Sequence, residues 1–361
     1  MAKKLTVVKT KKSDESTSKA NKYHFKNLVF EGGGVKGIAY VGALEILEKE
    51  KIMKNIERVA GTSAGALIAV LVGLGYSKDD LRQILWELDF KNFMDSSFGV
   101  VRNTKRLIAD YGWYKGDFFR DLVGGYIKKK TGNSESTFAD IAKMKQGGKK
   151  FKDIYLVGSN LSTGYSEIFS YEHTPRVCVA DAARISMSIP LFFAAVRGMR
   201  GDVYVDGGLL DNYAVKVFDR TKYVDTENYT RTSYYEEIND SLKAKSRKIT
   251  DYVYNKETLG FRLDNETEIS MYRDNAEPPI RKIESFFDYT KALLNTLIDF
   301  QNNVHLHSDD WQRTIYIDTL GVSSINFDIE DEMKTNLVES GKKHTQEYLD
   351  WYNNDEEKAN K

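Results

Sequence analysis

The residue best suited to nucleophilic chemistry is Ser63, in the pentapeptide Gly-Thr-Ser-Ala-Gly. It follows an apolar stretch typical of a strand and precedes a small, aliphatic stretch typical of a buried helix. A sharp turn between a strand and a helix exposes a serine hydroxyl, and Gly61 and Gly65 leave room for the two elements to approach each other. This arrangement predicts a nucleophilic serine.

A serine nucleophile needs a base, and the chain offers two kinds. In the order Ser, acid, His, a later histidine would complete a triad, but the histidines have polar helix or loop settings typical of surface residues. The alternative is Asp206, which ends an apolar strand and precedes Gly207 and Gly208. A desolvated carboxylate can take the serine proton directly. Asp-Gly-Gly is also a common turn, so this interpretation depends on Ser63. The histidines are His24, His173, His305, His307 and His344.

The stretch Glu-Gly-Gly-Gly-Val-Lys-Gly follows a short apolar strand and precedes a helical pattern. Gly32, Gly34 and Gly37 have the Gly-x-Gly-x-x-Gly spacing of dinucleotide-binding loops. Those folds also place an acidic residue at the end of the second strand, where it binds the ribose hydroxyls. Here that strand ends in the Ser63 turn, and Glu57 would lie at its beginning, on the wrong edge of the sheet. The unpaired N–H groups of the loop are therefore interpreted as donors to a transient oxyanion.

The composition is that of a soluble globular protein. The 361 residues carry a formal net charge of zero, with 29% charged and 41% hydrophobic residues, so no global charge favours nucleic acid or an acidic substrate. Cys178 is the only cysteine, which excludes an intramolecular disulfide and suits a reducing compartment. No cluster of His, Cys or carboxylates indicates a zinc or calcium site, so we expect neither a metal nor a cofactor.

The N-terminal segment, residues 1–26, is rich in Lys, Ser and Thr and lacks the apolar core of a secretory signal peptide. We interpret it as a solvated, disordered basic tail and expect no Sec-type export, while a specialised secretion route stays open. The longest apolar run, Ala66–Tyr76, is too short to span a bilayer and predicts a buried helix. We expect a cytoplasmic protein.

Strand and helix patterns alternate along the first part of the chain. A strand at 27–30, a helix at 35–51, the strand before Ser63 and the buried helix after it indicate a parallel α/β sheet with right-handed crossovers. Mostly amphipathic helix from about 78 to 148 predicts a helical cap or flank. The polar, tyrosine-rich segment 221–240 is typical of a mobile excursion. Further strands are predicted at 153–161, 166–171, 201–208, 258–264 and 313–318, and further helices at 178–188, at 283–307 and in a last segment ending near Tyr352.

Together and in this order, Gly-Gly-Gly-Val-Lys-Gly, Gly-Thr-Ser-Ala-Gly and Asp-Gly-Gly resemble the motifs of the patatin-like phospholipases, serine hydrolases with a Ser-Asp dyad. The resemblance runs from about Leu28 to Tyr352 and includes GWYKGDFF, STFADI, LVGSNLSTG, ARISMSIPLFF and ETLGFRLD. One departure is that LLDNYAV lacks the Pro that commonly follows the Asn after Asp-Gly-Gly, which bears on the shape of this loop.

The resemblance implies a three-layer α/β/α fold with a mostly parallel central sheet, a helical cap region and C-terminal helices. It makes residues 27–352 one acyl hydrolase domain, with the cap at about 78–148 and a C-terminal extension at about 218–352. Disordered tails are expected at 1–26 and 353–361.

At the site, the resemblance implies Ser63 as nucleophile and Asp206 as general base. It implies an oxyanion hole formed by Gly32, Gly33 and Gly34, with the N–H groups of Gly33 and Gly34 as donors. Lys36 fills the basic position of the glycine loop and is given no catalytic role. The residues that support these motifs are Lys36, Gly37, Gly61, Gly65, Gly207 and Gly208.

The activity implied is phospholipase A-type hydrolysis of acyl esters in glycerophospholipids, through an acyl-enzyme on Ser63, by a peripheral protein at membrane surfaces. Two alternatives stay open: an acylglycerol lipase or general esterase, and a catalytically latent member that binds a lipid or protein partner. The expected partners are the acyl-lipid substrate, a membrane surface in transient contact, and a protein or small-molecule activator, with no nucleic acid. SIPLFFAAV and FGVV fit an acyl-chain groove or membrane contact, and equally an ordinary core.

Overall fold

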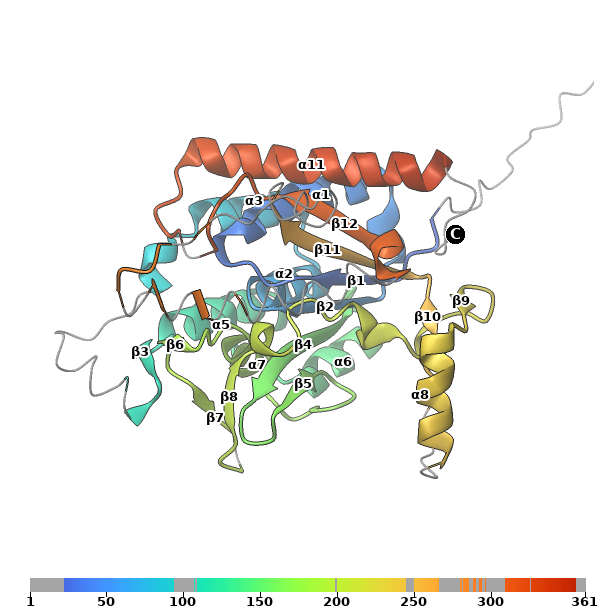
Figure 1. Ribbon diagram of the computed structural model, residues 1–361, viewed down its shortest axis with the longest axis horizontal. Coiled ribbons are helices and arrows are strands. Elements are labelled where there is room, and N and C mark those ends of the chain that lie inside the picture. Colours follow the sequence, from blue (N-terminus) through green and yellow to red (C-terminus); the bar gives the residue numbers. More distant parts are fainter. Residues whose placement is uncertain are drawn as a thin grey trace, which may run out of the picture.

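The computed structural model describes residues 23–93, 107, 109–198, 200–244, 250–265, 309–324 and 326–354, with scattered positions between 280 and 296. Within these residues the centre is an eight-stranded sheet in the order β12-β11-β1-β2-β4-β8-β7, with β5 paired to β4 (Figure 1). The first five strands of that order are parallel, and β8, β7 and β5 run antiparallel to their neighbours. The bounds are β1 Asn27–Phe30, β2 Arg58–Thr62, β4 Asp153–Asn160, β5 Tyr165–Phe169, β7 Val196–Arg197, β8 Val203–Asp206, β11 Thr258–Asp264 and β12 Thr314–Asp318.

The helices begin where the sequence supplies caps or loses its polar residues. Ser77 with Asp80, and Thr137 with Asp140, form capping boxes that start α3 and α6. All ten residues of α2 are buried, since this helix has no polar face. The bounds are η1 Gly34–Ile38, α1 Ala39–Lys49, α2 Ala64–Gly73, α3 Lys78–Glu87, α5 Asp117–Thr131, α6 Phe138–Gln146, α7 Val179–Ser186, α8 Ser233–Ala244 and α11 Asp331–Asn354.

The two faces of the sheet carry separate hydrophobic clusters. Leu28 and Phe30 point into a large core with side chains of α1, α2, α5, α7 and α11, while Val29 points to the other face. There it meets the segment 213–223, which contains the short helices η5 Val215–Phe218 and η6 Thr221–Tyr223. The three-layer α/β/α fold with a mostly parallel sheet is confirmed, with α11 and α1 lying together on one side (Figure 1). Within the described residues, the layer on the second face is thin.

The structure differs from the sequence-based expectations in two places along the chain. The tyrosine-rich segment is not an excursion without structure, because it forms η6, β9 Tyr229–Thr230 and α8. Its Tyr223 and Tyr235 are buried. The tail predicted to end at residue 26 is packed from residue 23 onward, since Tyr23 and Phe25 stack against each other and against Tyr352 of α11. Aromatic burial outweighs the polar composition in both places.

The predicted cap region is a flank of the main core. Phe119, Val123 and Ile127 of α5 belong to the same cluster as the sheet, because α5 packs on α7. A short strand, β3 Gly112–Tyr114, pairs in parallel with β6 Leu191–Phe193, which the sequence analysis did not predict. The predicted helix at 283–307 and the FGVV stretch lie largely or wholly outside the described residues.

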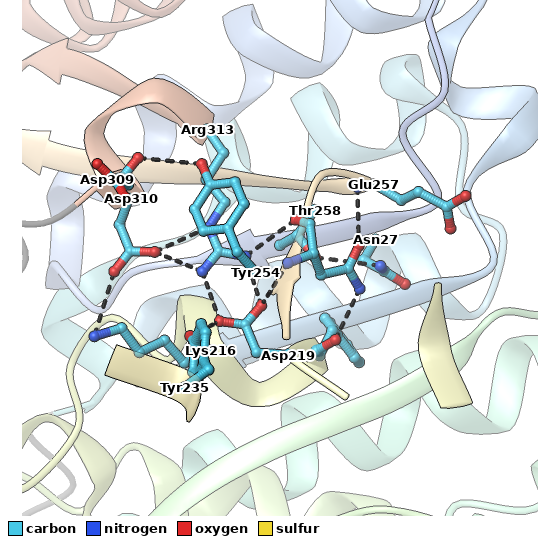
Figure 2. Close-up of polar contacts among 12 residues, drawn as sticks. Asn27, Lys216, Asp219, Tyr235, Tyr254, Glu257, Thr258, Asp309, Asp310 and Arg313 are labelled. Carbon is cyan, nitrogen blue, oxygen red and sulfur yellow. Dashed lines mark hydrogen bonds and ion pairs between the residues drawn. The ribbon is translucent and has the colours of Figure 1, made fainter. Parts of the chain in front are cut away.

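The C-terminal strands are joined to the rest of the fold by a buried ionic cluster at the amino-terminal edge of the sheet (Figure 2). Arg313 donates from both terminal nitrogens to Asp219, at 2.6 and 2.7 Å, and from Nε to Asp310 at 3.0 Å. The Tyr235 hydroxyl also donates to Asp219, which brings α8 into the cluster. Arg313 and Asp219 are fully buried, so each charge depends on the others.

Candidate active site

The predicted site residues meet at the carboxyl edge of the sheet, opposite the ionic cluster. Parallel β1 and β2 end there, in the glycine loop and in Ser63 respectively. On the next strand, β4, Val157 pairs with Thr62 and Gly158 pairs with Asp206. Ser63 follows Thr62 directly, so this register brings it level with Asp206.

Ser63 lies in a strained turn between β2 and α2. Its φ and ψ are 53° and −124°, a conformation that L-residues rarely adopt. The Ser63 N–H donates to the Ser186 hydroxyl at 3.0 Å, which helps to fix the turn. Because α2 begins at Ala64, the positive end of the helix dipole lies beside the Ser63 hydroxyl and favours negative charge there.

The glycines around Ser63 permit the close packing that the motif predicted. A Cβ on Gly61 would lie 2.1 Å from the Gly65 carbonyl oxygen, and a Cβ on Gly65 would lie 2.3 Å from the Phe30 carbonyl oxygen. Gly207 is equally confined, because a Cβ added there would lie 2.4 Å from the Val157 carbonyl oxygen. Any side chain at these positions would push β2, α2 and the Asp206 turn apart.

Asp206 is a buried carboxylate with one oxygen available. Its Oδ1 accepts from the Gly208 N–H at 2.6 Å, while Oδ2 is buried and has no hydrogen-bond partner in the described part of the chain. Burial raises the pKa of Asp206 to about 7, although the nearby Ser63 hydroxyl and the Gly208 N–H both favour the charged form. A carboxylate with this pKa is basic enough to accept a proton near neutral pH.

The three glycines of the predicted oxyanion hole differ in whether their N–H groups are already bonded. The Gly32 N–H donates to the Asn212 carbonyl at 3.2 Å, so it is not available to an oxyanion in this structure. Gly32 therefore supports the loop through its backbone and does not act as a donor. The N–H groups of Gly33 and Gly34 form no hydrogen bond within the described residues. Gly34 has a φ of +56°, which glycine adopts without strain. The supporting residue Lys36 donates to the Leu263 carbonyl at 3.4 Å, and Gly37 packs toward Ala64.

The described histidines do not contact Ser63. His173 bonds to Ser170, and His344 bonds to Ser340 on its own helix. His24 lies against Tyr352 at the far end of α11. His305 and His307 lie outside the described residues. Of the candidate bases that the sequence analysis named and the structure describes, Asp206 is the one level with Ser63.

Four residues that contact Ser63 or the glycine loop were missed by the sequence analysis. The Ser63 hydroxyl donates to the sulfur of buried Met187 at 3.7 Å, and Ser186 holds the Ser63 amide. Glu31 and Asn212 hold the glycine loop from behind, with Asn212 Nδ2 donating to Glu31 Oε1 at 3.1 Å. Glu31 directly precedes the glycines and Asn212 follows the Asp206 turn, so their positions beside motifs were the available signal.

The departure from the family pattern after Asn212 has a local explanation. Tyr213 occupies the position after the Asn, and its hydroxyl bonds to Thr314 Oγ1 at 2.7 Å. A Cβ on Gly260 would lie 1.7 Å from that hydroxyl, so the ring fills the place of a side chain on β11. The tyrosine anchors this loop to the C-terminal strands.

A narrow apolar cavity adjoins the nucleophile. Its wall includes Ala64 and Leu67 of α2, Gly34 of the glycine loop, Met187, and Phe193. The cavity volume is about 30 Å³, enough for only one or two water molecules. This volume is much smaller than that of an acyl chain. Ile189 and Phe193 of the SIPLFFAAV stretch contribute to this wall.

Neither a metal site nor a membrane span was found in the part of the chain that the structure describes. No group of three or more His, Cys, Asp or Glu side chains gathers there in a way that could hold a metal ion. None of the helices in those residues has the length and apolar character needed to cross a bilayer.

Comparison with known proteins gives consistent similarities. Residues 28–219 match the family model described as patatin-like phospholipase. The protein YqhO of Bacillus subtilis is 27% identical over 335 residues, which cover 89% of this chain and 97% of YqhO. The probable lipid hydrolase 463L of Invertebrate iridescent virus 6 is 25% identical over 216 residues, covering 58% of this chain and 68% of that protein.

Among solved structures, VipD from Legionella pneumophila has a similar fold. The TM-score is 0.55 at 19% sequence identity, and the match covers 91% of this chain and 67% of VipD. At this level of identity the likeness concerns the fold alone.

Proposed function

The chain belongs to the patatin-like phospholipase family, and on this premise we propose that it is a lipid acyl hydrolase of the phospholipase A type. The observation that carries the proposal is the pairing of a strained Ser63 with a buried Asp206 whose Oδ2 has no hydrogen-bond partner within the described residues. Backbone strain and an unpartnered buried carboxylate are both costly, and both concentrate at functional sites.

In the first half of the proposed reaction, Ser63 Oγ attacks the carbonyl carbon of the ester and its proton passes to Asp206 Oδ2. The N–H groups of Gly33 and Gly34 then donate to the oxyanion, each worth roughly a hundred- to a thousand-fold in rate. When the tetrahedral intermediate collapses, the ester bond breaks and the leaving alcohol, a lysophospholipid, takes the proton from Asp206. The fatty acyl group stays on Ser63.

In the second half, water attacks the acyl-enzyme and gives a proton to the Asp206 carboxylate. Collapse of the second intermediate releases the fatty acid, and Ser63 Oγ recovers a proton from Asp206. No metal or cofactor takes part in this scheme. The acyl chain is proposed to enter the apolar cavity beside Met187, whose flexible side chain can move aside.

A catalytically latent state is the second candidate, favoured by a specific contact. The Ser63 hydroxyl donates to the Met187 sulfur at 3.7 Å, and the cavity is too small for a chain. Such a protein would wait for a membrane surface or an activator before hydrolysing lipid. Acylglycerol lipase or esterase activity uses the same chemistry and differs only in the headgroup accepted. We also propose a cytoplasmic location with transient membrane contact.

Labelling with a fluorophosphonate ester tests the proposal directly. We expect a single adduct on Ser63, located by mass spectrometry of the intact chain and its peptides, and none on the Ser63→Ala variant. A rate of labelling that rises on anionic phospholipid vesicles would indicate a latent enzyme. Absence of any adduct, in solution and on vesicles, would reject the nucleophile.

Substrate class is then read from product analysis. Phosphatidylcholine and phosphatidylglycerol vesicles should give free fatty acid and lysophospholipid, while triacylglycerol emulsions should give much less. Replacement of all five histidines by glutamine should leave this activity largely intact. Loss of activity in a folded histidine-free variant would overturn the role of Asp206 as base.

A further inference from the structure

Glu31 is a buried carboxylate directly before the glycine loop, with both oxygens engaged. Its side chain is held between two segments distant in sequence: Oε1 accepts from Asn212 Nδ2 at 3.1 Å, and Oε2 accepts from the Leu263 N–H at 2.7 Å. Only 1% of the residue is exposed. Burial of a carboxylate is costly, so two good hydrogen bonds here indicate that its position matters.

Asn212 links Glu31 to the glycine loop at a second and a third point. Its Nδ2 also donates to the Gly32 carbonyl at 3.3 Å, and its own carbonyl accepts from the Gly32 N–H at 3.2 Å. Gly32 is thus held at both its N–H and its carbonyl, which belong to two successive peptide units. A Cβ on Gly32 would lie 2.9 Å from Ser63 Cβ, so a shift of this residue would be felt at the nucleophile.

Asn212 also packs against the turn that carries the base. A Cβ on Gly208 would lie 2.8 Å from Asn212 Oδ1 and 3.0 Å from Asp206 Oδ1. The preceding residue, Asp211, accepts from the Thr62 hydroxyl at 3.1 Å through its carbonyl, beside the Ser63 elbow. One amide side chain therefore lies against the glycine loop and the Asp-Gly-Gly turn at once.

We propose that Glu31 and Asn212 are positioning residues for the hydrolysis, forming a strut that holds the oxyanion donors in register with Ser63 and Asp206. The inference rests on the proposed function and adds two residues that act through others. Glu31 fixes the orientation of the Asn212 amide, and Asn212 holds the Gly32 N–H and the Gly32 carbonyl. That carbonyl shares its peptide unit with the donor N–H of Gly33, and the donor N–H of Gly34 follows in the next unit.

The charge state of Glu31 gives the strut a pH dependence. Burial raises the pKa of Glu31 to about 7, opposed by the Arg262 guanidinium and strengthened by the Asp264 carboxylate. Protonation turns one carboxylate oxygen into an O–H donor and a weaker acceptor, so a hydrogen bond from Asn212 or Leu263 is weakened and the strut loosens as the pH falls through this range. Other charged or titratable groups that face Glu31 are Lys36 of η1, Tyr40 of α1 and Tyr316 of β12.

The test compares Glu31→Gln with wild type on a soluble p-nitrophenyl ester, with active molecules counted by fluorophosphonate. We expect kcat to fall about 10- to 100-fold with KM nearly unchanged, because a small misplacement of donors costs rate and not binding. On the acid side, log(kcat/KM) of wild type should rise with a slope above one, since both Glu31 and Asp206 must ionise. In Glu31→Gln the slope should drop to one.

Asn212→Ala is a second variant, and combining it with Glu31→Gln completes a double-mutant cycle. If both residues act in one strut, the double variant should be no slower than the slower single variant. Glu257→Gln is the matched control, because Glu257 is also a buried carboxylate but lies at the opposite, amino-terminal edge of the sheet. This variant should leave kcat unchanged. Additive losses, or an unchanged acid slope in Glu31→Gln, would overturn the strut. Failure of Ser63→Ala to abolish turnover would instead reject the proposed function.

Discussion

Asp206 and Asp219 are both buried aspartates, yet the fold satisfies one and not the other. At the amino-terminal edge of the sheet, each oxygen of Asp219 accepts from Arg313, and Tyr235 and the Asn255 N–H add further bonds. At the carboxyl edge, Asp206 has the Gly208 N–H on one oxygen and no hydrogen bond on the other within the described chain.

This difference separates a structural charge from a reactive one. Paired charges offset part of the cost of their own burial, and the Arg313 cluster joins β12, α8 and the segment around Asp219. The cost of burying Asp206 is not offset and appears as increased basicity, with a pKa of about 7. The same substitution, Asp to Asn, should therefore have opposite consequences at the two edges.

The largest effect is expected for Asp206→Asn on activity. Without a carboxylate to take the Ser63 proton, kcat should fall by about 10⁴- to 10⁶-fold, as for bases that act as a unit with their nucleophile. Circular dichroism and melting temperature should remain those of a folded protein. Initial rates on phospholipid vesicles measure the loss, and activity within tenfold of wild type would contradict the comparison.

Next comes Asp219→Asn on stability. The variant leaves Arg313 buried with one carboxylate partner fewer, and we expect a loss of about 3–5 kcal/mol in the free energy of unfolding. Urea denaturation followed by tryptophan fluorescence measures it. Activity per fluorophosphonate-labelled molecule should stay within about twofold, because the catalytic edge is untouched. A change in stability below about 1 kcal/mol would show that the cluster does not join the layers.

Asp206→Asn should raise stability, and the size of the gain should depend on pH. The pKa of Asp206 is raised on folding from 3.8 to about 7, so between these values the folded state holds a proton that the unfolded state has released. Stability due to this group therefore falls as the pH rises from about 4 to 7, and the penalty is complete above 7. At about 1.4 kcal/mol per pKa unit, the variant should gain up to about 4 kcal/mol at pH 8. Paired urea titrations at pH 4.5 and 8 test this, and an equal difference at both would contradict it.

How well the sequence predicts these two regions depends on how far apart in the sequence their interacting residues lie. The Ser63 elbow, the glycine loop and the Asp206 turn are local motifs, and in the structure they lie close together at one edge of the sheet. The Asp219–Arg313 pair spans 94 positions and the Glu31–Asn212 pair 181, with no local pattern to reveal either. The roles assigned to Ser63 and Asp206 remain predictions that the labelling and variants above test.

The tyrosine-rich segment illustrates the same limit. Its polar composition predicts mobility, but Tyr235 is buried because its hydroxyl has a partner in Asp219 on another element. The tertiary partner, which composition does not encode, decides the outcome.

The smallest effect concerns the backbone of the nucleophile. Ser63 has a φ of 53°, which costs a residue with a Cβ about 1–3 kcal/mol and costs glycine little. Ser63→Gly should therefore be more stable than Ser63→Ala by about 1 kcal/mol, although both lack the hydroxyl and both are inactive. Both Ser63→Gly and Ser63→Ala lose the contact with Met187, so the difference between their stabilities reports the backbone strain alone. Equal urea midpoints for the two would mean that the elbow relaxes once the hydroxyl is gone, and that side-chain contacts, not the tight packing of Gly61 and Gly65, hold the turn in its conformation.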